Sequence, residues 1–371
     1  MNEQRIIDDE IRRLADSAGS AVLATVISVR GSAYRRPGAR MIIHEDGRTV
    51  GLISGGCLDA DVMERANFVH ATGQHTVVRY DTTAREDSVW GLALGCTGIV
   101  EVLLERVPFQ TPVRFATGED EGPRVIATVL ESGDKIIVDS DGAVLSGSDD
   151  AGIAPLVQEA LGFLARGISG LTAIRTDGAP QQVFFDVIQP PLPLLVFGGG
   201  NDAIPLVRLA HDLGWAVTVV DHRPAYATEG RFPWATTILT GHPEEIFDRL
   251  LLTPRTVAVV MTHAITLDTT IVRHLLAAPV RYIGLLGPKN KGEKILSDLD
   301  AAGTMVDEER RRTLFNPAGL DIGAETPEEI AVSIAGEIQT LIARRPGRHL
   351  RFRNAPIHGG ASIASDGTPG V

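Results

Sequence analysis

The stretch Leu194–Ala203, with the sequence LLVFGGGNDA, determines the fold of the C-terminal half of the chain. Its four apolar residues are typical of a buried parallel strand, and the glycines follow where a helix is expected to begin. The G-x-G-x-x-A spacing lets the backbone turn tightly and approach a pyrophosphate at the N-terminus of that helix. Gly198, Gly199, Gly200 and Asn201 are therefore candidate cofactor-binding residues. The alternative is that the glycines serve only the packing of the helix against the strand.

The next apolar run favours a ligand at this turn, because the run ends in an acid. Asp221 follows Val219 and Val220, 23 residues after Gly198. At this spacing an acidic side chain meets a ribose hydroxyl in dinucleotide-binding domains. Arg223, just beyond, offers a phosphate group an alternative partner. Both Asp221 and Arg223 are candidate cofactor-binding residues.

Further apolar runs predict a doubly wound parallel sheet over residues 191–345, after a proline-rich connector. The runs expected to form its strands are Leu194–Phe197, Ala216–Val220, Thr237–Leu239, Val257–Met261 and Tyr282–Leu286. Thr326, Pro327 and Glu329 predict a capping box at the start of a late helix. Residues 346–371 lose this periodicity, and a flexible tail is expected there.

Two polar residues near the fourth of these runs are further candidates. His263 follows the run directly after Thr262, and Asp268 comes shortly afterwards. The carboxyl ends of parallel strands line the ligand crevice of an open α/β sheet, so His263 and Asp268 are candidate ligand contacts. A role in capping or turn formation suits the same residues equally well.

The first 190 residues contain a weak internal repeat, which predicts two copies of one α+β unit. The copies are assigned to residues 1–108 and to residues 109–190, the latter including the connector. Asp-Gly pairs fit a hairpin turn in each copy, and a predicted helix ends at Gly73 in the first copy and at Gly167 in the second. The predicted fold class is therefore α/β, with an N-terminal duplicated α+β region followed by a C-terminal Rossmann-like parallel sheet domain.

Three glycine-rich loops occur in the first copy alone, at residues 31–38, 54–59 and 91–98. The second copy is therefore expected to be a scaffold, and the first copy is expected to hold a site. Arginine forks match phosphate geometry and a hydroxyl adds a further donor, which makes Ser32 and Arg35 candidates for anion binding. A solvated hairpin tip is the alternative for the first loop.

Cys57 and Cys96 lie in the second and third of these loops, and Gly55 and Gly56 precede Cys57. A thiolate near basic groups such as Arg35, Arg36 or Arg40 can act as a nucleophile, a persulfide carrier or a soft metal ligand. We predict that both cysteines are metal ligands and that Gly55 and Gly56 approach the cofactor. The alternative is a small buried hydrophobe, which is the usual role of a free cysteine. Two cysteines exclude a disulfide scaffold, and the absence of a C-x-x-C motif argues against structural zinc.

Composition excludes several classes of protein. The net charge is −12, and we find no long Lys/Arg run of the kind that marks a nucleic-acid-binding protein. An apolar stretch of about 20 residues, the length needed to cross a bilayer, is absent from the sequence. The first 18 residues show the pattern of an amphipathic surface helix rather than a signal peptide. A cytoplasmic protein that binds neither nucleic acid nor membrane is expected.

Taken in order along the chain, these motifs resemble those of the XdhC/CoxI family. The segments that carry the resemblance are 31–40, 54–58, 95–98, 198–201, 220–224, 262–268, 282–287, 319–323 and 326–330. They cover both ends of the globular part and omit much of the second copy and the tail. Asn201 departs from the family pattern, which often has His at this position.

The resemblance implies an accessory protein rather than an enzyme, with no catalytic residues of its own. Family members bind molybdenum cofactor and deliver it to xanthine dehydrogenase, carbon monoxide dehydrogenase and related molybdenum hydroxylases. The implied ligand is molybdopterin or its dinucleotide form, and the implied partners are a client hydroxylase and a cysteine desulfurase. A homodimer is the commonest default for such a chain.

Two other functions are compatible with the same motifs. An NAD(P)-dependent oxidoreductase is the alternative, because the glycine turn and Asp221 suit NAD equally well. A nucleotide-sensing interaction module is a third interpretation, since fold alone does not determine function.

Overall fold

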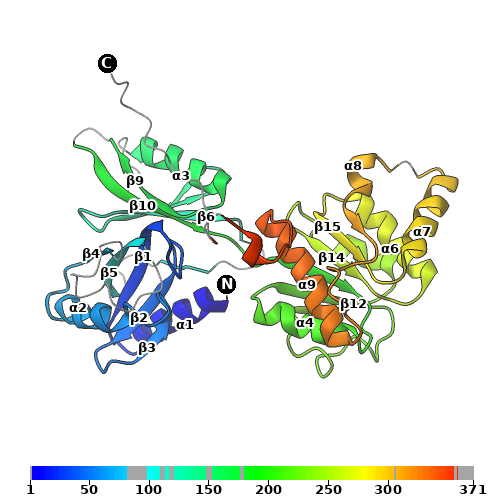
Figure 1. Cartoon of the computed structure of the whole chain (residues 1–371), viewed down its shortest axis with the longest axis horizontal. Helices are drawn as coiled ribbons and strands as arrows, with labels where there is room; N and C mark the ends of the chain where they lie inside the picture. Colours follow the sequence, from blue (N-terminus) through cyan, green and yellow to red (C-terminus); the bar gives the residue numbers. More distant parts are fainter. Residues whose placement is uncertain are drawn as a thin grey trace, which may run out of the picture. The chain divides into compact units, whose positions relative to one another are not determined.

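The computed structural model describes residues 2–81, 98–108, 113–116, 121–147, 153–175, 179–304, 306–354 and 357. The chain divides into two units (Figure 1). The N-terminal unit contains Glu3–Pro190 and the chain from His349 onward. The C-terminal unit is Pro191–Arg348 together with the first two residues.

The N-terminal unit contains two antiparallel five-stranded sheets that share one strand order. The first has the order β3-β2-β1-β5-β4, and its strands are β1 (Ala21–Gly31), β2 (Arg40–His44), β3 (Thr49–Gly51), β4 (Thr76–Asp81) and β5 (Gly98–Val107). The second has the order β8-β7-β6-β10-β9, and its strands are β6 (Arg124–Val129), β7 (Lys135–Asp139), β8 (Val144–Ser146), β9 (Gly170–Ile174) and β10 (Gln181–Ile188). The identical order confirms the predicted duplication.

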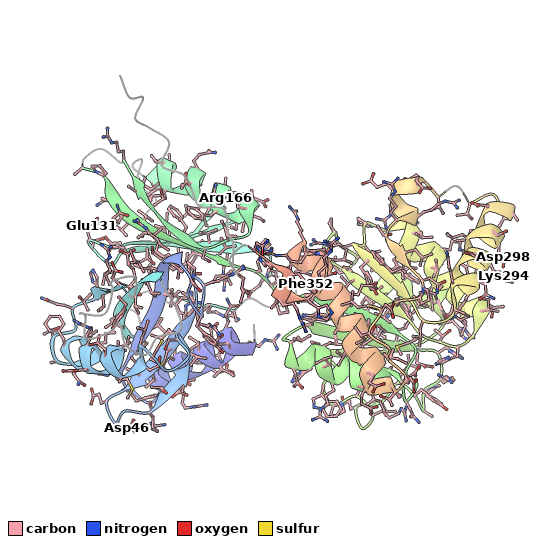
Figure 2. The ribbon with its side chains drawn as sticks, viewed as in Figure 1. Asp46, Glu131, Arg166, Lys294, Asp298 and Phe352 are labelled. Atoms are coloured by element: carbon pink, nitrogen blue, oxygen red, sulfur yellow. The ribbon has the colours of Figure 1, made fainter. Side chains whose placement is uncertain are left out.

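Each sheet carries one helix between its third and fourth strands. These helices are α2 (Asp59–Thr72) and α3 (Ala154–Arg166), and α1 (Asn2–Asp16) precedes the first sheet. As predicted, Gly73 and Gly167 end α2 and α3 in the left-handed conformation, with φ of 72° and 65°. Asp46 lies at the tip of the β2–β3 hairpin (Figure 2), where its carboxylate accepts a hydrogen bond from the Arg48 N–H.

Four sets of apolar contacts arrange the N-terminal unit in layers. Helix α2 packs on one face of the first sheet, and α3 packs on one face of the second. The opposite faces of the two sheets meet at Ile27, Leu103 and Phe184, while Ile7 of α1 joins a cluster that includes side chains of both sheets. The two copies therefore share a core between their sheets.

The C-terminal unit contains a six-stranded, wholly parallel sheet. Its strands are β11 (Pro193–Phe197), β12 (Ala216–Asp221), β13 (Thr237–Thr240), β14 (Val257–Val260), β15 (Tyr282–Leu285) and β16 (Leu314–Phe315). The order β13-β12-β11-β14-β15-β16 is the 3-2-1-4-5-6 order of a Rossmann fold, with its topological switch between β11 and β14. The predicted Rossmann-like domain is confirmed, while β16 was not predicted because two residues give no apolar run.

Helices cover both faces of this sheet. The helical elements are α4 (Ala203–Asp212), α5 (Pro243–Ile246), η2 (Phe247–Arg249), α6 (Ile265–Ala277), α7 (Lys289–Ala301), α8 (Glu308–Arg311) and α9 (Pro327–Ala343). Side chains of α4 and α9 belong to one core cluster with the sheet, and side chains of α6 and α7 belong to another. Thr326 and Glu329 form the predicted capping box at the start of α9.

The predicted tail begins with one short element, η3 (Leu350–Phe352), a turn of 3₁₀ helix. Phe352 in this turn is 71% exposed (Figure 2). Among the described residues, no helix combines the length and the apolar character needed to span a membrane.

Arg310 of α8 holds the C-terminal end of α6 in place. Its guanidinium donates hydrogen bonds to the carbonyl oxygens of Leu275 and Leu276, both at 3.0 Å, of Val280 at 3.1 Å and of Ala278. The last carbonyl groups of a helix have no partner within the helix, so a charged donor that reaches several of them satisfies groups that otherwise depend on water.

Replacing this guanidinium should destabilise the C-terminal unit. We expect Arg310→Ala to lower the free energy of unfolding by about 3 kcal/mol, because several charge-assisted hydrogen bonds are lost together. The control is Arg312→Ala, whose exposed ion pair with Glu308 spans 3.7 Å and should contribute less than about 0.5 kcal/mol. Urea unfolding followed by the fluorescence of Trp215 and Trp234 measures both variants, and equal losses would contradict the assigned role of Arg310.

Candidate functional site

The glycine turn between β11 and α4 is formed by close approach of neighbouring backbone. The Gly198 N–H donates to the Val220 carbonyl at 2.8 Å, and Gly198 has a φ of 114°. A Cβ atom on Gly198 would clash with the Met261 carbonyl, and one on Gly199 would lie 2.6 Å from the Tyr226 carbonyl oxygen. Packing therefore accounts for these two glycines without any ligand.

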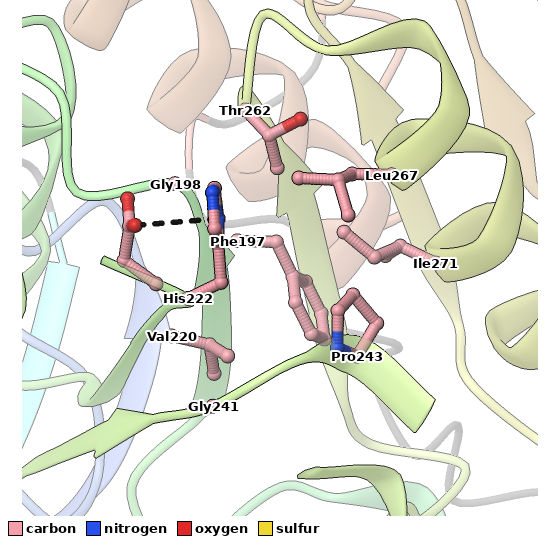
Figure 3. A pocket seen from close by; sticks show the side chains of 10 residues that line it. Phe197, Gly198, Val220, His222, Gly241, Pro243, Thr262, Leu267 and Ile271 are labelled. Atoms are coloured by element: carbon pink, nitrogen blue, oxygen red, sulfur yellow. Dashed lines mark ion pairs between the residues drawn. The ribbon is translucent and has the colours of Figure 1, made fainter. Parts of the chain in front are cut away.

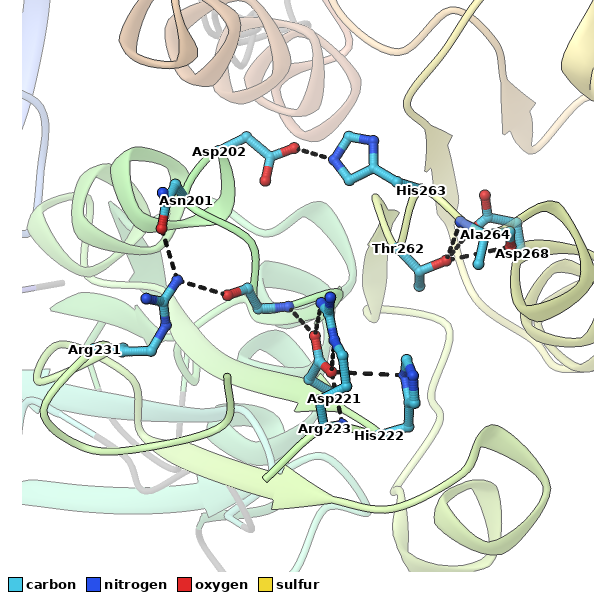
Figure 4. Close-up of polar contacts among 11 residues, drawn as sticks. Asn201, Asp202, Asp221, His222, Arg223, Arg231, Thr262, His263, Ala264 and Asp268 are labelled. Carbon is cyan, nitrogen blue, oxygen red and sulfur yellow. Dashed lines mark hydrogen bonds and ion pairs between the residues drawn. The ribbon is translucent and has the colours of Figure 1, made fainter. Parts of the chain in front are cut away.

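Asp221, at the end of β12, joins this turn to its own strand. One carboxylate oxygen accepts from the Gly199 N–H at 2.7 Å and from a terminal guanidinium nitrogen of Arg223 at 2.8 Å. The other accepts from the Arg223 N–H at 2.8 Å and from Arg223 Nε at 2.9 Å (Figure 4). Burial raises the pKa of Asp221, but the hydrogen bonds from Arg223 and Gly199 outweigh burial, so its pKa lies below the ordinary value.

A second arginine, Arg231, lies on the same turn, and no sequence motif indicated it. One of its terminal nitrogens donates to the Gly199 carbonyl at 3.0 Å and to Asn201 Oδ1 at 2.9 Å (Figure 4). The guanidinium carbons of Arg223 and Arg231 lie 3.7 and 5.1 Å from the centroid of the Tyr226 ring. Two guanidinium groups therefore lie beside the turn, and cation–π contacts with Tyr226 help to hold them there.

The N-terminus of α4 keeps donors free beside these arginines. The backbone N–H groups of Gly200, Asn201 and Asp202 have no hydrogen-bond partner among the described residues. Helix N-termini attract anions because such N–H groups point outward and because the helix dipole favours negative charge. This end of α4 therefore has the donors and the charge that suit a phosphate group.

The predicted residues after β14 form two polar groups. Thr262 Oγ1 donates to Asp268 Oδ1 at 2.6 Å, and the other oxygen of Asp268 lies 2.5 Å from Lys291 Nζ of α7. Asp268 is fully buried, so the cation compensates its charge inside the protein. His263 points the other way, and its Nε2 lies 2.7 Å from Asp202 Oδ2 (Figure 4). Asp268 thus links α6 to α7 through its ion pair with Lys291, while His263 faces the start of α4.

A shallow hollow that is open to solvent lies at the carboxyl edge of the sheet. Its lining side chains include those of Phe197, Val220, His222, Pro243 and Thr262 (Figure 3). Most of this lining is apolar, and its polar side chains are those of Asp221, His222 and Thr262.

In the N-terminal unit, the first of the three predicted glycine-rich loops contacts described residues of the other two. The ring of Tyr34, in the first loop, lies 3.6 Å from the position that a Cβ on Gly55 would take. Gly98, the last residue of the third loop, pairs with Gly31, and a Cβ there would lie 2.6 Å from the Ser32 carbonyl oxygen. The described parts of the three loops found only in the first copy therefore lie side by side.

A buried serine fixes the loop that carries Cys57. Ser54 Oγ donates to Asp59 Oδ1 at 2.5 Å and accepts from the Gly56 N–H at 3.0 Å. Cys57 is half-buried and has a free thiol, which packs against the core of the first copy. Cys96 lies outside the described residues. Within the part of the chain that is described, no group of three or more His, Cys, Asp or Glu side chains is placed to hold a metal ion.

One of the arginines in and beside the first loop, Arg40, is not available to a ligand as the sequence predicted. Arg40 is 2% exposed and forms an ion pair with the buried Asp186 of the second copy, so it is not available to a thiolate or an anion. Arg35 pairs with Glu3 of α1 and remains partly exposed. Arg40 was wrongly grouped with the loop because no local pattern indicated its partner.

The strand order and the glycine turn place the C-terminal unit in the class of Rossmann-type domains. Two family models match the chain: the XdhC Rossmann domain over residues 194–338, and the XdhC and CoxI family over residues 14–81. A relative from Bacillus subtilis, named as a probable subunit of xanthine dehydrogenase, is 35% identical over 329 residues, which cover 88% of this chain and 94% of the relative. The chain belongs to the XdhC and CoxI family.

Two other proteins match the chain, one over about a quarter of its length and one over most of it. The Escherichia coli protein named "Molybdenum cofactor insertion chaperone PaoD" is 35% identical over 98 residues, which are 26% of this chain and 30% of that protein. A crystal structure described as a xanthine dehydrogenase from Bacillus halodurans matches with a TM-score of 0.71 and 28% identity, covering 91% of this chain and 96% of that one. Most of the chain therefore has a counterpart of similar fold among solved structures.

The hydrogen bonds of Asp221 predict a pH-dependent contribution to stability. We expect Asp221→Asn to lower the free energy of unfolding at pH 7 by about 2 kcal/mol, because a buried acceptor of charged donors is lost. The folded pKa lies below the unfolded one, so the contribution is fully present above the unfolded value of about 3.9 and disappears as the pH falls through the folded value.

Urea unfolding between pH 7 and pH 3 measures this contribution. The gap between the parent chain and Asp221→Asn should stay constant down to about pH 5 and shrink below about pH 4. The control is Asp298→Asn on the exposed side of α7, which should change stability by less than about 0.5 kcal/mol. A gap that persists unchanged at the lowest pH would show that the carboxylate charge is not responsible.

Proposed function

We propose that this chain binds molybdenum cofactor and delivers it to a molybdenum hydroxylase of the xanthine dehydrogenase type. Membership of the XdhC and CoxI family and the name of the relative PaoD support this proposal. The observation that carries it is the set of free N–H groups at Gly200, Asn201 and Asp202, because the pterin of this cofactor carries a phosphate. The proposed role is that of a carrier, not of an enzyme.

The phosphate end of the cofactor is assigned to the C-terminal unit. Amides of the glycine turn would hold the phosphate oxygens, and the guanidinium groups of Arg223 and Arg231 lie close enough to the turn to stabilise the added charge. His263, beside the turn, completes the group of candidate contacts, while Asp221 keeps the turn in shape through its bonds to Gly199 and Arg223. In the dinucleotide form of the cofactor, the added nucleotide would lie against the shallow apolar hollow beside His222.

The molybdenum end is assigned to the thiols of the first copy. Cys57 follows the exposed Gly55 and Gly56 on the second loop, and the ring of Tyr34 of the first loop lies beside Gly55. Thiolate sulfur is a soft ligand, and a half-buried thiol on a fixed loop can contact a ligand without a large rearrangement. Cys96 is proposed as its partner on the strength of the sequence alone.

The partners of Asp221 favour this proposal over an NAD(P)-dependent oxidoreductase. A ribose diol needs a carboxylate with free lone pairs, whereas both oxygens of Asp221 already accept two hydrogen bonds each from Gly199 and Arg223. Binding a ribose there would require breaking the contacts that shape the glycine turn.

Analysis of the ligand that copurifies with the full chain tests the proposed function. The chain is produced in bacteria supplied with molybdate, and the bound material is identified by mass spectrometry and by molybdenum analysis. A molybdopterin together with molybdenum is the expected result, and transfer should restore the activity of a cofactor-free hydroxylase. Bound NAD, or protein without any pterin under these conditions, would contradict the proposal.

Loss of the thiols should affect the binding of molybdenum more than the binding of the pterin. We expect the double variant Cys57→Ser and Cys96→Ser to retain pterin while its molybdenum content per pterin falls at least about fivefold, because the phosphate contacts remain and a soft ligand is lost. Each single variant shows which thiol matters, and thermal unfolding checks that the fold is intact. An unchanged ratio of molybdenum to pterin in the double variant would rule out metal ligation by these cysteines.

A further inference from the structure

A carboxylate of the protein itself lies over the proposed phosphate site. Asp202 directly precedes α4, and one of its oxygens occupies the space that a Cβ on Gly200 would need. The other oxygen lies 2.7 Å from His263 Nε2. The carboxylate is thus held between the glycine turn and a histidine from the end of β14 (Figure 4).

Helix capping does not explain this position. An aspartate just before a helix usually accepts a hydrogen bond from the N–H groups of the first turn, but the Asp202 side chain accepts none. The carboxylate therefore places negative charge beside the free amides of residues 200–202 without satisfying them. Its interaction with those amides is through charge alone.

The backbone of His263 is specialised to reach Asp202. His263 has a φ of 60°, a left-handed conformation that is uncommon for residues other than glycine. Residues in such strained conformations cluster at functional sites. Its side chain is 67% exposed, whereas that of Asp202 is 19% exposed. The histidine is therefore accessible to a ligand from solvent while it holds the carboxylate in place.

The other charged groups nearby already have partners. Arg223 is paired with Asp221, and Lys291 is paired with Asp268. Arg231 contacts the neutral groups of Gly199 and Asn201. Asp202 and His263 thus form the pair at this turn that a ligand can exchange without breaking a buried ion pair.

We propose that Asp202 acts as an internal competitor for the phosphate of the ligand, and that His263 changes partner from Asp202 to the phosphate when the ligand binds. The proposal rests on the phosphate site of the proposed function. Two anions at one helix N-terminus repel each other, so the carboxylate must move away before a phosphate can contact the amides. Asp202 therefore weakens capture and favours release, as a carrier requires.

Sulfate is the probe for this exchange, because it mimics phosphate and keeps its double negative charge near neutral pH. Isothermal titration of the full chain at about 0.1 M ionic strength compares the parent with Asp202→Asn. Asparagine caps helices as well as aspartate does, so α4 should remain intact. We expect sulfate to bind about tenfold more tightly to Asp202→Asn, since removing one nearby like charge is worth about 1.4 kcal/mol at such a site.

The matched control is Asp212→Asn, which removes the same charge from the exposed C-terminal end of the same helix. Its affinity for sulfate should change less than about twofold, because the site lies beyond a screening length of about 10 Å at 0.1 M salt. In the Asp202→Asn background, His263→Ala should weaken sulfate binding again, since the imidazole now serves the anion.

Three outcomes would overturn the proposal. They are an equal gain in Asp212→Asn, an unchanged affinity in Asp202→Asn, and the absence of sulfate binding in every variant up to tens of millimolar. These outcomes are independent of the copurified ligand. Failure to find a pterin contradicts the proposed function while leaving the exchange intact, and failure of the exchange leaves pterin binding untouched.

Discussion

The geometry of the site depends on the buried carboxylate of Asp221. A charge that is 4% exposed costs free energy unless it is paired and fully hydrogen-bonded, and here four donors from Gly199 and Arg223 compensate it. The same bonds fix the second residue of the glycine turn relative to the end of β12. Because the chain then enters α4 directly, the directions of the free N–H groups at residues 200–202 follow from this one interaction.

A comparable constraint links the two copies of the N-terminal unit. Asp186 of the second copy pairs with Arg40 and accepts a hydrogen bond from Ser169 at 3.0 Å, and its carboxylate would lie 3.1 Å from a Cβ on Gly38. The second copy thereby supports the end of the first loop, which only the first copy possesses. Duplication followed by divergence explains this arrangement, since one copy can change its loops while the other supplies a rigid surface beneath them.

The sequence predicted the features that depend on local patterns and missed those that depend on packing. Apolar runs, terminal glycines and the capping box at Thr326 are encoded within a few residues, so the Rossmann order and the duplication could be anticipated. Arg231 and β16 had no local signal, because an arginine 30 residues from Asn201 and a strand of two residues acquire meaning only through tertiary contacts. The burial of Arg40 was missed for the same reason, since its partner is 146 residues away.

Two aspartates flank the glycine turn, and their surroundings give them different properties. Asp221 is enclosed by four donors, so an incoming ligand cannot displace it without breaking the turn. Asp202 has a single histidine partner and no bond to the amides beside it, so its displacement requires the loss of one exposed interaction. In the proposed exchange the two groups have different parts: Asp221 keeps the donors in position, and Asp202 moves away from the amides when an anion binds and back when it leaves. The number of hydrogen bonds at each carboxylate therefore distinguishes the part of the site that is permanent from the part that can exchange.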